Sequence, residues 1–356
     1  MSPQQRRLLP YLSLFLVWIV WGSTYLFIRV AVREVPPFAA ASLRFVASGL
    51  VMAVVAFVVD RRDGRPSLRQ VADYALIGVL LLGVGNAFLM WAEKRIPSGI
   101  AALIVAAVPL WITLCEGLRK GGEPWTTRTW AGTLIGLAGV ALVARPTGGL
   151  GGEHWKAVLL LQVGTLAWTF GSLYSQSVSR RPSGSLPLAS AAAIEMLAAS
   201  AVLGLESWCF GERWSDVAAA SPTAWGALAY LTVFGSLVGF TAYIWLLGVS
   251  TPARVSTYAY VNPVVAVLLG WALAGEPLTP RMMVAAAIIV CAVAAITAGQ
   301  ATRRRPAMER PETAAATACL TQDEKVDDVA APAAAPVPEP LRHTPRTRRA
   351  RAAGED

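Results

Sequence analysis

Long apolar windows alternate with short polar loops along most of this chain. Each window is close to the roughly 20 residues that an α-helix needs to cross the hydrocarbon of a bilayer. Ten windows recur at regular intervals, at 8–31, 37–59, 71–92, 97–116, 127–144, 155–178, 187–208, 223–247, 253–274 and 280–300. The pattern predicts an all-α membrane protein with ten transmembrane helices, here called spans one to ten.

Span nine has an unusual distribution of polar residues. From Val255 to Ala274 there is no charged residue, yet the first half of the span carries serine, threonine, tyrosine and asparagine. Pro263 also interrupts the backbone hydrogen bonds of the predicted helix. Polar groups that face lipid are unfavourable unless something in the protein satisfies them. The pattern therefore predicts that this half of span nine lines a cavity.

A weaker copy of the span-nine region lies upstream, which indicates a duplication. Pro97, Pro109 and Glu123 correspond to Pro252, Pro263 and Glu276, with shifts of 155, 154 and 153 residues. Gly22-Ser23 likewise matches Gly171-Ser172, with a shift of 149. Each half, 8–144 and 155–300, holds five spans. Since five is odd, the two halves insert in opposite orientations, as two inverted repeats typical of secondary transporters.

Charge predicts the orientation and limits the partners. Hydrophobic residues make up 55% of the chain and charged residues 15%, with a net charge of +9. Loops on one side of the membrane hold fifteen lysines and arginines and loops on the other side seven. The positive-inside rule then places both termini in the cytoplasm. No soluble basic face exists in residues 1–300, so we expect the lipid bilayer and a small-molecule substrate as partners, and no nucleic acid.

The last segment, 301–356, differs in composition from the spans. Alanine, proline and threonine dominate it, with an acidic patch followed by a basic run. Such a segment cannot bury enough apolar surface to fold by itself. We predict a disordered cytoplasmic tail.

Three ionisable residues within or at the ends of spans are candidates for proton coupling or substrate binding. Arg44 lies about a third of the way along span two, Glu195 is near the centre of span seven, and Glu93 ends span three. A buried carboxyl group suits proton coupling, so Glu195 and Glu93 are the proton-coupling candidates. The alternative is a structural salt bridge between Arg44 and Glu195, which align within about one residue under the repeat. For Glu93, a position at the membrane interface is the alternative.

Uncharged polar and aromatic residues recur in spans one, three, six and nine. Helix–helix hydrogen bonds would explain any one of them, but their clustering in corresponding parts of both halves favours a central pocket. With Arg44, the substrate-binding candidates are Trp21, Ser23, Tyr25, Asn86, Trp168, Ser172, Tyr174, Tyr258, Tyr260 and Asn262. Pro109 and Pro263 are the candidate hinges.

Motifs of ATP-driven or enzymatic chemistry do not occur in the sequence. There is no phosphate-binding Gly-x4-Gly-Lys-Ser/Thr loop and no His-Glu-x2-His zinc motif, and the two histidines lie in a loop and in the tail. We therefore expect no enzymatic activity, no cofactor and no metal. An ion gradient or exchange of substrates is left as the source of energy.

Several short motifs together resemble a known transporter family. They are Trp21-Gly-Ser-Thr-Tyr25, Leu43-Arg44-Phe45, Pro97-Ser-Gly-Ile-Ala-Ala, Ala193-Ile-Glu195-Met-Leu-Ala, Phe234-Gly-Ser236 and Tyr258-Ala-Tyr-Val-Asn262-Pro. Over about residues 8–300 they resemble the EamA family of the drug/metabolite transporter superfamily, in its YedA-like branch. The resemblance implies two EamA repeats in a bacterial inner membrane and export of metabolites or toxic compounds. It also implies a cavity between spans one to four and six to nine. Spans five and ten would be peripheral, where they could form a homodimer contact.

We therefore predict a secondary active exporter of small organic metabolites, amino-acid-like compounds or drugs, driven by proton antiport or exchange. A carrier of nucleotide sugars or lipid precursors is one alternative, although it should have a more basic cavity than Arg44 alone provides. A polytopic intramembrane enzyme is another, and it would need a nucleophile or a metal set that the sequence lacks. A sensor or scaffold is the third, and only the tail supports it.

Overall fold

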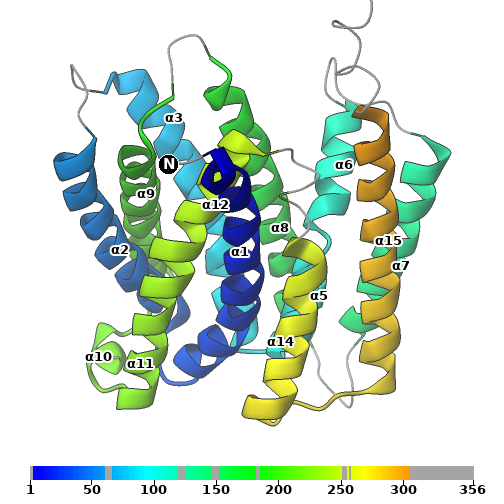
Figure 1. Cartoon of the computed structure of the whole chain (residues 1–356). Coiled ribbons are helices and arrows are strands. Elements are labelled where there is room, and N and C mark those ends of the chain that lie inside the picture. Colours follow the sequence, from blue (N-terminus) through cyan, green and yellow to red (C-terminus); the bar gives the residue numbers. More distant parts are fainter. Residues whose placement is uncertain are drawn as a thin grey trace, which may run out of the picture. The chain divides into compact units, whose positions relative to one another are not determined.

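Every element that the structure describes is helical. The computed structural model describes residues 3–60, 66–118, 126–145, 152–181, 185–250, 255 and 258–304, without the side chains of residues 3–7, Arg128, Tyr260 and 296–304. Within these ranges there is no strand. The elements are α1 (Pro3–Val32), α2 (Pro37–Val59), α3 (Leu68–Gly78), η1 (Val79–Asn86), α4 (Ala87–Glu93), α5 (Ser98–Val105), α6 (Val108–Leu118), α7 (Thr127–Ala144), α8 (Gly152–Ser179), α9 (Leu188–Cys209), α10 (Trp214–Ala218), α11 (Pro222–Tyr230), η2 (Leu231–Phe240), α12 (Thr241–Val249), α14 (Tyr258–Ala274) and α15 (Pro280–Arg304) (Figure 1).

Seven helical segments of the described chain are long and apolar enough to cross a membrane. They are Leu8–Val32, Pro37–Val59, Leu68–Glu93, Ser98–Leu118, Gly152–Ser179, Leu188–Cys209 and Pro222–Val249. Three shorter apolar helices, Thr129–Ala144, Val261–Ala274 and Pro280–Ala295, coincide with predicted spans five, nine and ten. These helices fall in one compact unit, Met1–Arg303. The predicted tail lies outside the described residues from position 305 onward.

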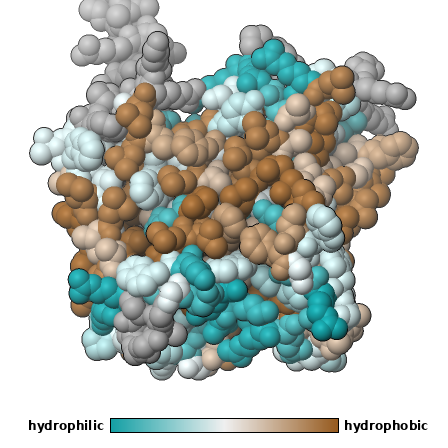
Figure 2. Space-filling view, turned by 180° about the vertical axis from the view of Figure 1, so that it is seen from behind, coloured by the Kyte–Doolittle hydropathy of each residue, from teal (hydrophilic) through white to brown (hydrophobic). Residues whose placement is uncertain are grey.

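The outer surface of this unit is apolar where lipid would contact it. Large hydrophobic side chains project outward, such as Phe57, which is 92% exposed, and Leu134, Trp271 and Leu273. Figure 2 shows one face, where hydrophobic residues form a broad band across the middle and hydrophilic residues gather below it. Exposure on this scale is unfavourable in water but favourable in hydrocarbon.

Two helical segments are wound as π-helices, and they occupy corresponding positions in the two halves. η1 lies in the middle of span three, between α3 and α4, and η2 lies in the middle of span eight, between α11 and α12. Each contains two glycines, at 83 and 85 in η1 and at 235 and 239 in η2. π-Helical turns are rare, and they occur frequently at functional sites.

At the start of four helices, a carboxylate from the other half of the sequence accepts hydrogen bonds. Glu212 accepts hydrogen bonds from the first backbone N–H groups of α2, and Asp60 accepts them from Ser190 in α9. Glu276 does the same for α5, and Glu34 for α11. These carboxylates satisfy N–H groups that have no partner within their own helix, and they complement the positive end of the helix dipole.

The first two of these caps are reciprocal. α2 packs extensively along α9, the carboxylate that follows α9 caps the start of α2, and the carboxylate that follows α2 caps the start of α9. The two helices therefore run antiparallel. Their ends meet in the same way at both ends of the pair.

The helices of predicted spans five and ten lie at the edge of the bundle. In Figure 1, α7 and α15 stand beside α6, on one side of the other helices. Gly136 and Gly139 of α7 face Leu110 of α6 and Ile289 of α15 at distances that leave no room for a larger side chain. The two helices thus pack against each other within one chain.

Candidate functional site

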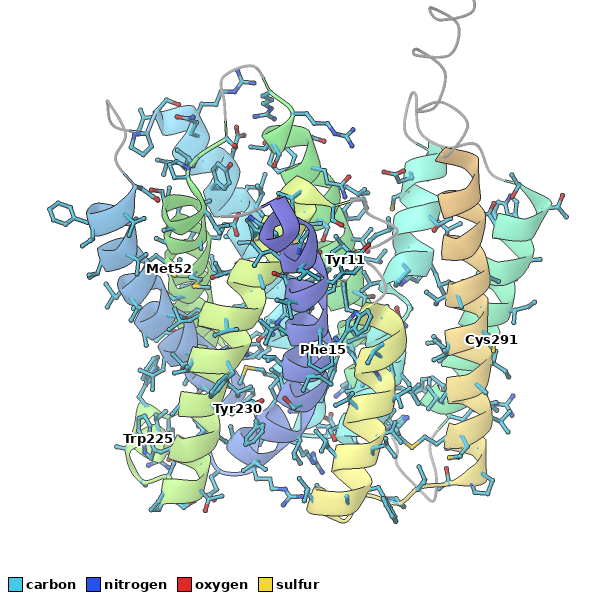
Figure 3. All side chains as sticks on the ribbon, in the orientation of Figure 1. Tyr11, Phe15, Met52, Trp225, Tyr230 and Cys291 are labelled. Atoms are coloured by element: carbon cyan, nitrogen blue, oxygen red, sulfur yellow. The ribbon has the colours of Figure 1, made fainter. Side chains whose placement is uncertain are left out.

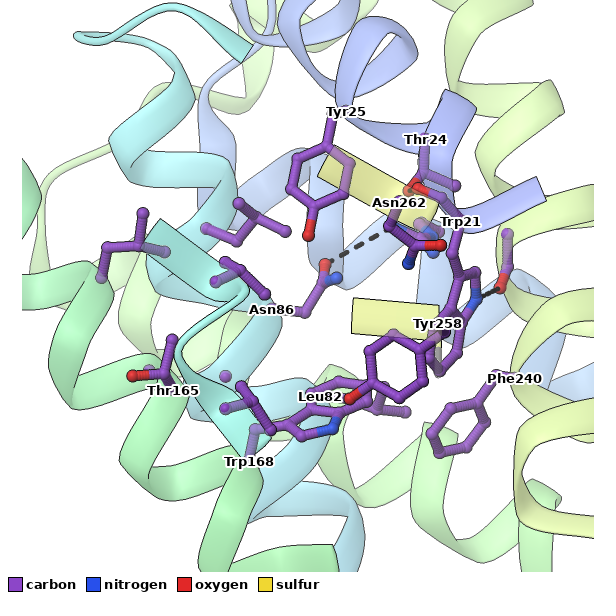
Figure 4. A pocket seen from close by; sticks show the side chains of 18 of the residues that line it. Trp21, Thr24, Tyr25, Leu82, Asn86, Thr165, Trp168, Phe240, Tyr258 and Asn262 are labelled. Atoms are coloured by element: carbon purple, nitrogen blue, oxygen red, sulfur yellow. Dashed lines mark hydrogen bonds between the residues drawn. The ribbon is translucent and has the colours of Figure 1, made fainter. Parts of the chain in front are cut away.

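A cavity lies inside the bundle, between helices of both halves. Figure 4 shows how aromatic and amide side chains converge on it. Its wall is formed by Trp21, Thr24, Tyr25, Arg44, Phe45, Leu82, Gly85, Asn86, Leu89, Val105, Val108, Leu161, Gly164, Thr165, Trp168, Gly235, Phe240, Tyr258 and Asn262. Sites for small organic molecules typically combine such apolar and aromatic walls with a few polar groups.

Seven of the predicted substrate-binding residues line this cavity. They come from α1, α2, η1, α8 and α14, which are far apart in the sequence, and they are Trp21, Tyr25, Arg44, Asn86, Trp168, Tyr258 and Asn262. The same physical signal identified all seven, namely a polar or aromatic side chain within an apolar span. The fold brings them together because the spans that carry them surround one space.

Arg44 provides the only charged side chain among the described residues of the wall. It is 5% exposed, and it lies on α2 with its guanidinium directed at both π-helical segments. Its Nε donates to the Ser236 hydroxyl in η2 at 2.8 Å, and its Nη1 donates to the Asn86 side-chain oxygen in η1 at 3.4 Å. Gly235 allows this approach, because a Cβ atom there would lie 2.8 Å from Nη2.

An aromatic cluster forms the wall near Trp21. The Trp21 ring centroid lies 5.6 Å from that of Trp168 and 5.5 Å from that of Tyr258, both in edge-on arrangements. Tyr243 packs behind them, 4.9 Å from Trp21. The Trp21 Nε1 donates to the Gly235 carbonyl oxygen at 3.2 Å, which fixes the indole ring against η2.

Three predicted residues point elsewhere, and a fourth has no described side chain. Ser23 bonds to Tyr230, which lies on the side of α11 toward α1 (Figure 3). Ser172 bonds to the hydroxyl of Tyr243 at 3.0 Å, behind the wall. Tyr174 donates to Asp73 of α3 at 2.6 Å, and Arg181 forms an ion pair with the same carboxylate. The side chain of Tyr260 lies outside the described residues.

Glu93 and Glu195 are both fully buried, and neither lines the cavity. Within the described part of the chain, no hydrogen-bond donor reaches either oxygen of either carboxyl group. Near Glu93, Arg29 donates to the backbone oxygen of Glu93 rather than to its carboxylate. The ion pairs among the described residues do not include Arg44 with Glu195, so the structure gives no support to the predicted alternative of a salt bridge between them.

The two predicted hinge prolines sit in different settings. Pro109 is the second residue of α6, just after a break that separates α5 from α6 at Ala106 and Ala107. Pro263 lies inside α14, where the helix continues. In the preceding residue, the Asn262 amide nitrogen is placed to donate to the backbone oxygens of Tyr258 at 3.2 Å and Trp18 at 3.1 Å.

Sequence reasoning missed two polar residues that hold the site together. Ser236 accepts from Arg44, and Tyr243 supports the aromatic cluster. Ser236 lies in a Gly-x3-Gly spacing, which indicates helix packing and hides a polar contact. Tyr243 is a single tyrosine in an otherwise apolar stretch, the same signal that identified Tyr25.

Comparison with known proteins places the chain in a family. The sequence matches the EamA-like transporter family twice, over residues 8–145 and 155–298. It is 43% identical over 297 residues to the uncharacterized inner membrane transporter YedA of Escherichia coli, a match that covers 83% of this chain and 93% of that protein. It is 24% identical to a probable terminal-alkyne amino-acid exporter of Streptantibioticus cattleyicolor, over 83% of this chain and 95% of that one.

A solved crystal structure shares the fold. It is 21% identical in sequence, has a TM-score of 0.59 and covers 83% of this chain and 98% of its own. Together with the apolar helices, the matches identify a multi-pass inner membrane protein that is a transporter rather than an enzyme. Because the matched segments cover most of the sequence, the chain belongs to the EamA-like transporter family.

Proposed function

We propose that this protein is a secondary active transporter that exports small organic metabolites or drugs through the central cavity. The observation that carries the proposal is the cavity wall, which combines aromatic rings, amides and Arg44 from both sequence halves. Transporters bind substrate between their repeats near the midplane of the membrane. The export direction rests on the relative named as an amino-acid exporter.

The proposed architecture is ten membrane spans arranged as two inverted repeats of five. The three shorter apolar helices complete the count beside the seven long ones. The reciprocal caps of α2 and α9, and the π-helical segments at corresponding positions, are what a pseudo-twofold axis in the membrane plane would produce. The excess of basic residues in alternate loops supports cytoplasmic termini.

The proposed energy source is a proton gradient, with substrate exchange as the mode that needs no gradient. Glu195 and Glu93 are the proton carriers of this proposal, because each is fully buried and has no donor among the described residues. An unpaired carboxylate is unfavourable in such a position, whereas a protonated carboxyl group is tolerated. Each group would thus take up and release a proton when the surrounding helices move.

Metabolite profiling would test the proposed export. Medium from bacterial cells that produce the protein should contain at least one organic compound at a higher level than medium from cells without it. Cells that produce Arg44→Gln at the same membrane level serve as the control for the cavity. If the media of producing and non-producing cells are indistinguishable under several nutrient conditions, export is the wrong function.

A further inference from the structure

We propose that the central cavity selects organic anions, specifically carboxylates that carry an aromatic or similar apolar group, and that Arg44 is their receptor. The proposal deepens the proposed transport function and rests on it. It names the charge and shape of the substrate from the wall of the cavity.

The charge of the wall is the first argument. Among the described residues that line it, Arg44 is the one group charged at neutral pH, and none is an aspartate or a glutamate. Within the described chain, Arg44 bonds to a serine hydroxyl and an asparagine oxygen and lies 4.8 Å from the Phe45 ring centroid, and all three groups are neutral. A buried cation without a counter-ion is unfavourable, and an incoming carboxylate would supply the missing charge.

The donor geometry is the second argument. A guanidinium has five N–H groups in a planar fork, and the two recorded bonds use one on Nε and one on Nη1. Among the described residues, the second N–H of Nη1 and the two of Nη2 have no hydrogen-bond partner, and Arg44 is part of the cavity wall. Two parallel N–H groups match the two oxygens of a carboxylate, which gives a strong and directional contact.

The aromatic wall is the third argument. Trp21, Trp168 and Tyr258 meet edge to face, and Tyr25 and Phe240 complete the same wall. These rings present apolar surface and edges against which a further ring can pack at offset or edge-on geometry. An aromatic wall would also attract an organic cation. Arg44 opposes that alternative, because its charge repels a cation and the described lining residues offer no carboxylate in compensation.

The position of Arg44 explains how an anion bound there would act on the rest of the molecule. Arg44 on α2 contacts η1 through Asn86 and η2 through Ser236, so one side chain joins the π-helical segments of both halves. A carboxylate on the remaining N–H groups would share this guanidinium with Asn86 and Ser236. Substrate binding would thereby affect the contacts of Arg44 with η1 and η2, where the two halves meet.

Three matched probes can test the charge preference directly. 3-Phenylpropionate, 3-phenylpropan-1-ol and 3-phenylpropylamine share the ring and the chain, and they differ in being anionic, neutral and cationic. Binding to the full-length protein in lipid nanodiscs is measured by tryptophan fluorescence, since two tryptophans line the cavity. We expect the anion to bind at least about tenfold more tightly than the alcohol, which corresponds to one charge-assisted contact, and the amine to bind more weakly than either.

Variants at Arg44 test its role. Arg44→Gln should reduce the preference for the anion over the alcohol to about threefold or less, while Arg44→Lys should keep its direction with lower affinity, because lysine lacks the planar fork. Arg281→Gln is the matched control, because Arg281 lies at the start of α15 and bonds to a loop carbonyl. It should bind all three probes as the unmodified protein does. If Arg44→Gln does not fold, the lysine variant and the three probes on the unmodified protein still decide the question.

Several results would overturn the inference. They are equal binding of the three probes, tighter binding of the amine, and an equal loss of anion binding in Arg281→Gln and Arg44→Gln. Failure of all three probes to bind, while the protein still exports a compound in the profiling experiment, also refutes anion selection and leaves the transport function standing. Absence of any exported compound would instead count against the transport function itself.

Discussion

Replacing Glu195 by glutamine separates proton coupling from substrate binding. The substitution keeps the size of the side chain and removes its ability to titrate. Glu195 is fully buried on α9, and both carboxyl oxygens lack a donor among the described residues. Its backbone is held tightly against α3, since a Cβ atom at Gly78 would lie 2.1 Å from the Glu195 carbonyl oxygen. The change should therefore stay local to the side chain.

The structure sets the expected effect on stability. If Glu195 neutralised Arg44, its loss would leave a buried cation unpaired and would lower the free energy of unfolding by about 3–5 kcal/mol. Arg44 instead bonds to Ser236 and Asn86. We therefore expect Glu195→Gln to change the free energy of unfolding by less than about 1.5 kcal/mol, the range of a near-isosteric substitution.

The expected effect on transport is much larger. With one proton exchanged per substrate and the membrane potential held at zero, each unit of pH difference drives about a tenfold substrate gradient, equivalent to about 1.4 kcal/mol. The unmodified protein should approach that ratio. A variant that cannot carry the proton should show no dependence on the pH difference, while exchange of labelled for unlabelled substrate at equal pH continues.

Proteoliposomes allow both measurements on one preparation. Uptake of the exported compound is followed at pH differences of zero, one and two units, and exchange is followed at equal pH. Glu206→Gln is the matched control, because Glu206 lies on the same helix and also has an unpartnered carboxyl oxygen among the described residues. It should keep the pH dependence. A Glu195→Gln variant that retains the tenfold response, or one that is unstable and is rescued by Arg44→Met, would refute the proton role.

Three further substitutions test other parts of the structure. Gly239→Ala should impair export and destabilise the protein by about 1–3 kcal/mol, because the new Cβ would lie 2.6 Å from the Trp21 indole nitrogen. Gly226→Ala is its control, because a Cβ atom there meets nothing within 4 Å. Both variants are compared in export and thermal-unfolding assays. Asn262→Ala should slow export at matched membrane levels and lower stability by about 1–2 kcal/mol, since it removes the hydrogen bonds of the side-chain amide to two backbone oxygens. An unchanged export rate would show that Asn262 contributes to packing alone. Hydrogen bonds from the backbone N–H and the hydroxyl of Ser221, at the start of α11, hold the pKa of Glu34 below its ordinary value. The stability that Glu34 contributes is therefore present above about pH 4.3, its ordinary pKa. It is lost as the pH falls through the lower pKa of the folded protein. Thermal unfolding across this range should show the unmodified protein losing its advantage over Glu34→Gln on acidification, and a constant difference would contradict the assignment.

The sequence predicted much of the cavity wall, because the signal for it is simple. A tryptophan, arginine or asparagine in an apolar span needs a partner or a cavity, and Trp21, Arg44 and Asn86 all line the cavity. The same signal cannot distinguish a cavity from a helix–helix contact. Tyr174 carries it equally, yet its hydroxyl bonds to Asp73.

Other features could not be predicted from a single sequence. Aligning the repeats placed Arg44 and Glu195 at equivalent positions, but equivalent positions in two repeats need not bring two side chains into contact. The π-helical winding of η1 and η2 depends on which backbone carbonyl each N–H group selects, and composition does not specify that choice. Ser236 was missed for a different reason, because its Gly-x3-Gly spacing indicates helix packing.

The carboxylate caps have a consequence for how the protein is made. Glu34 and Asp60 cap helices of the second half, and Glu212 and Glu276 cap helices of the first. When synthesis has reached only the middle of the chain, the starts of α2 and α5 lack their capping carboxylates. Glu34 and Asp60 likewise have no helix start to cap. A nascent first half therefore leaves backbone N–H groups at two helix starts without the carboxylates that bind them in the finished protein. We therefore expect two halves synthesised as separate polypeptides to need each other for complete helix caps.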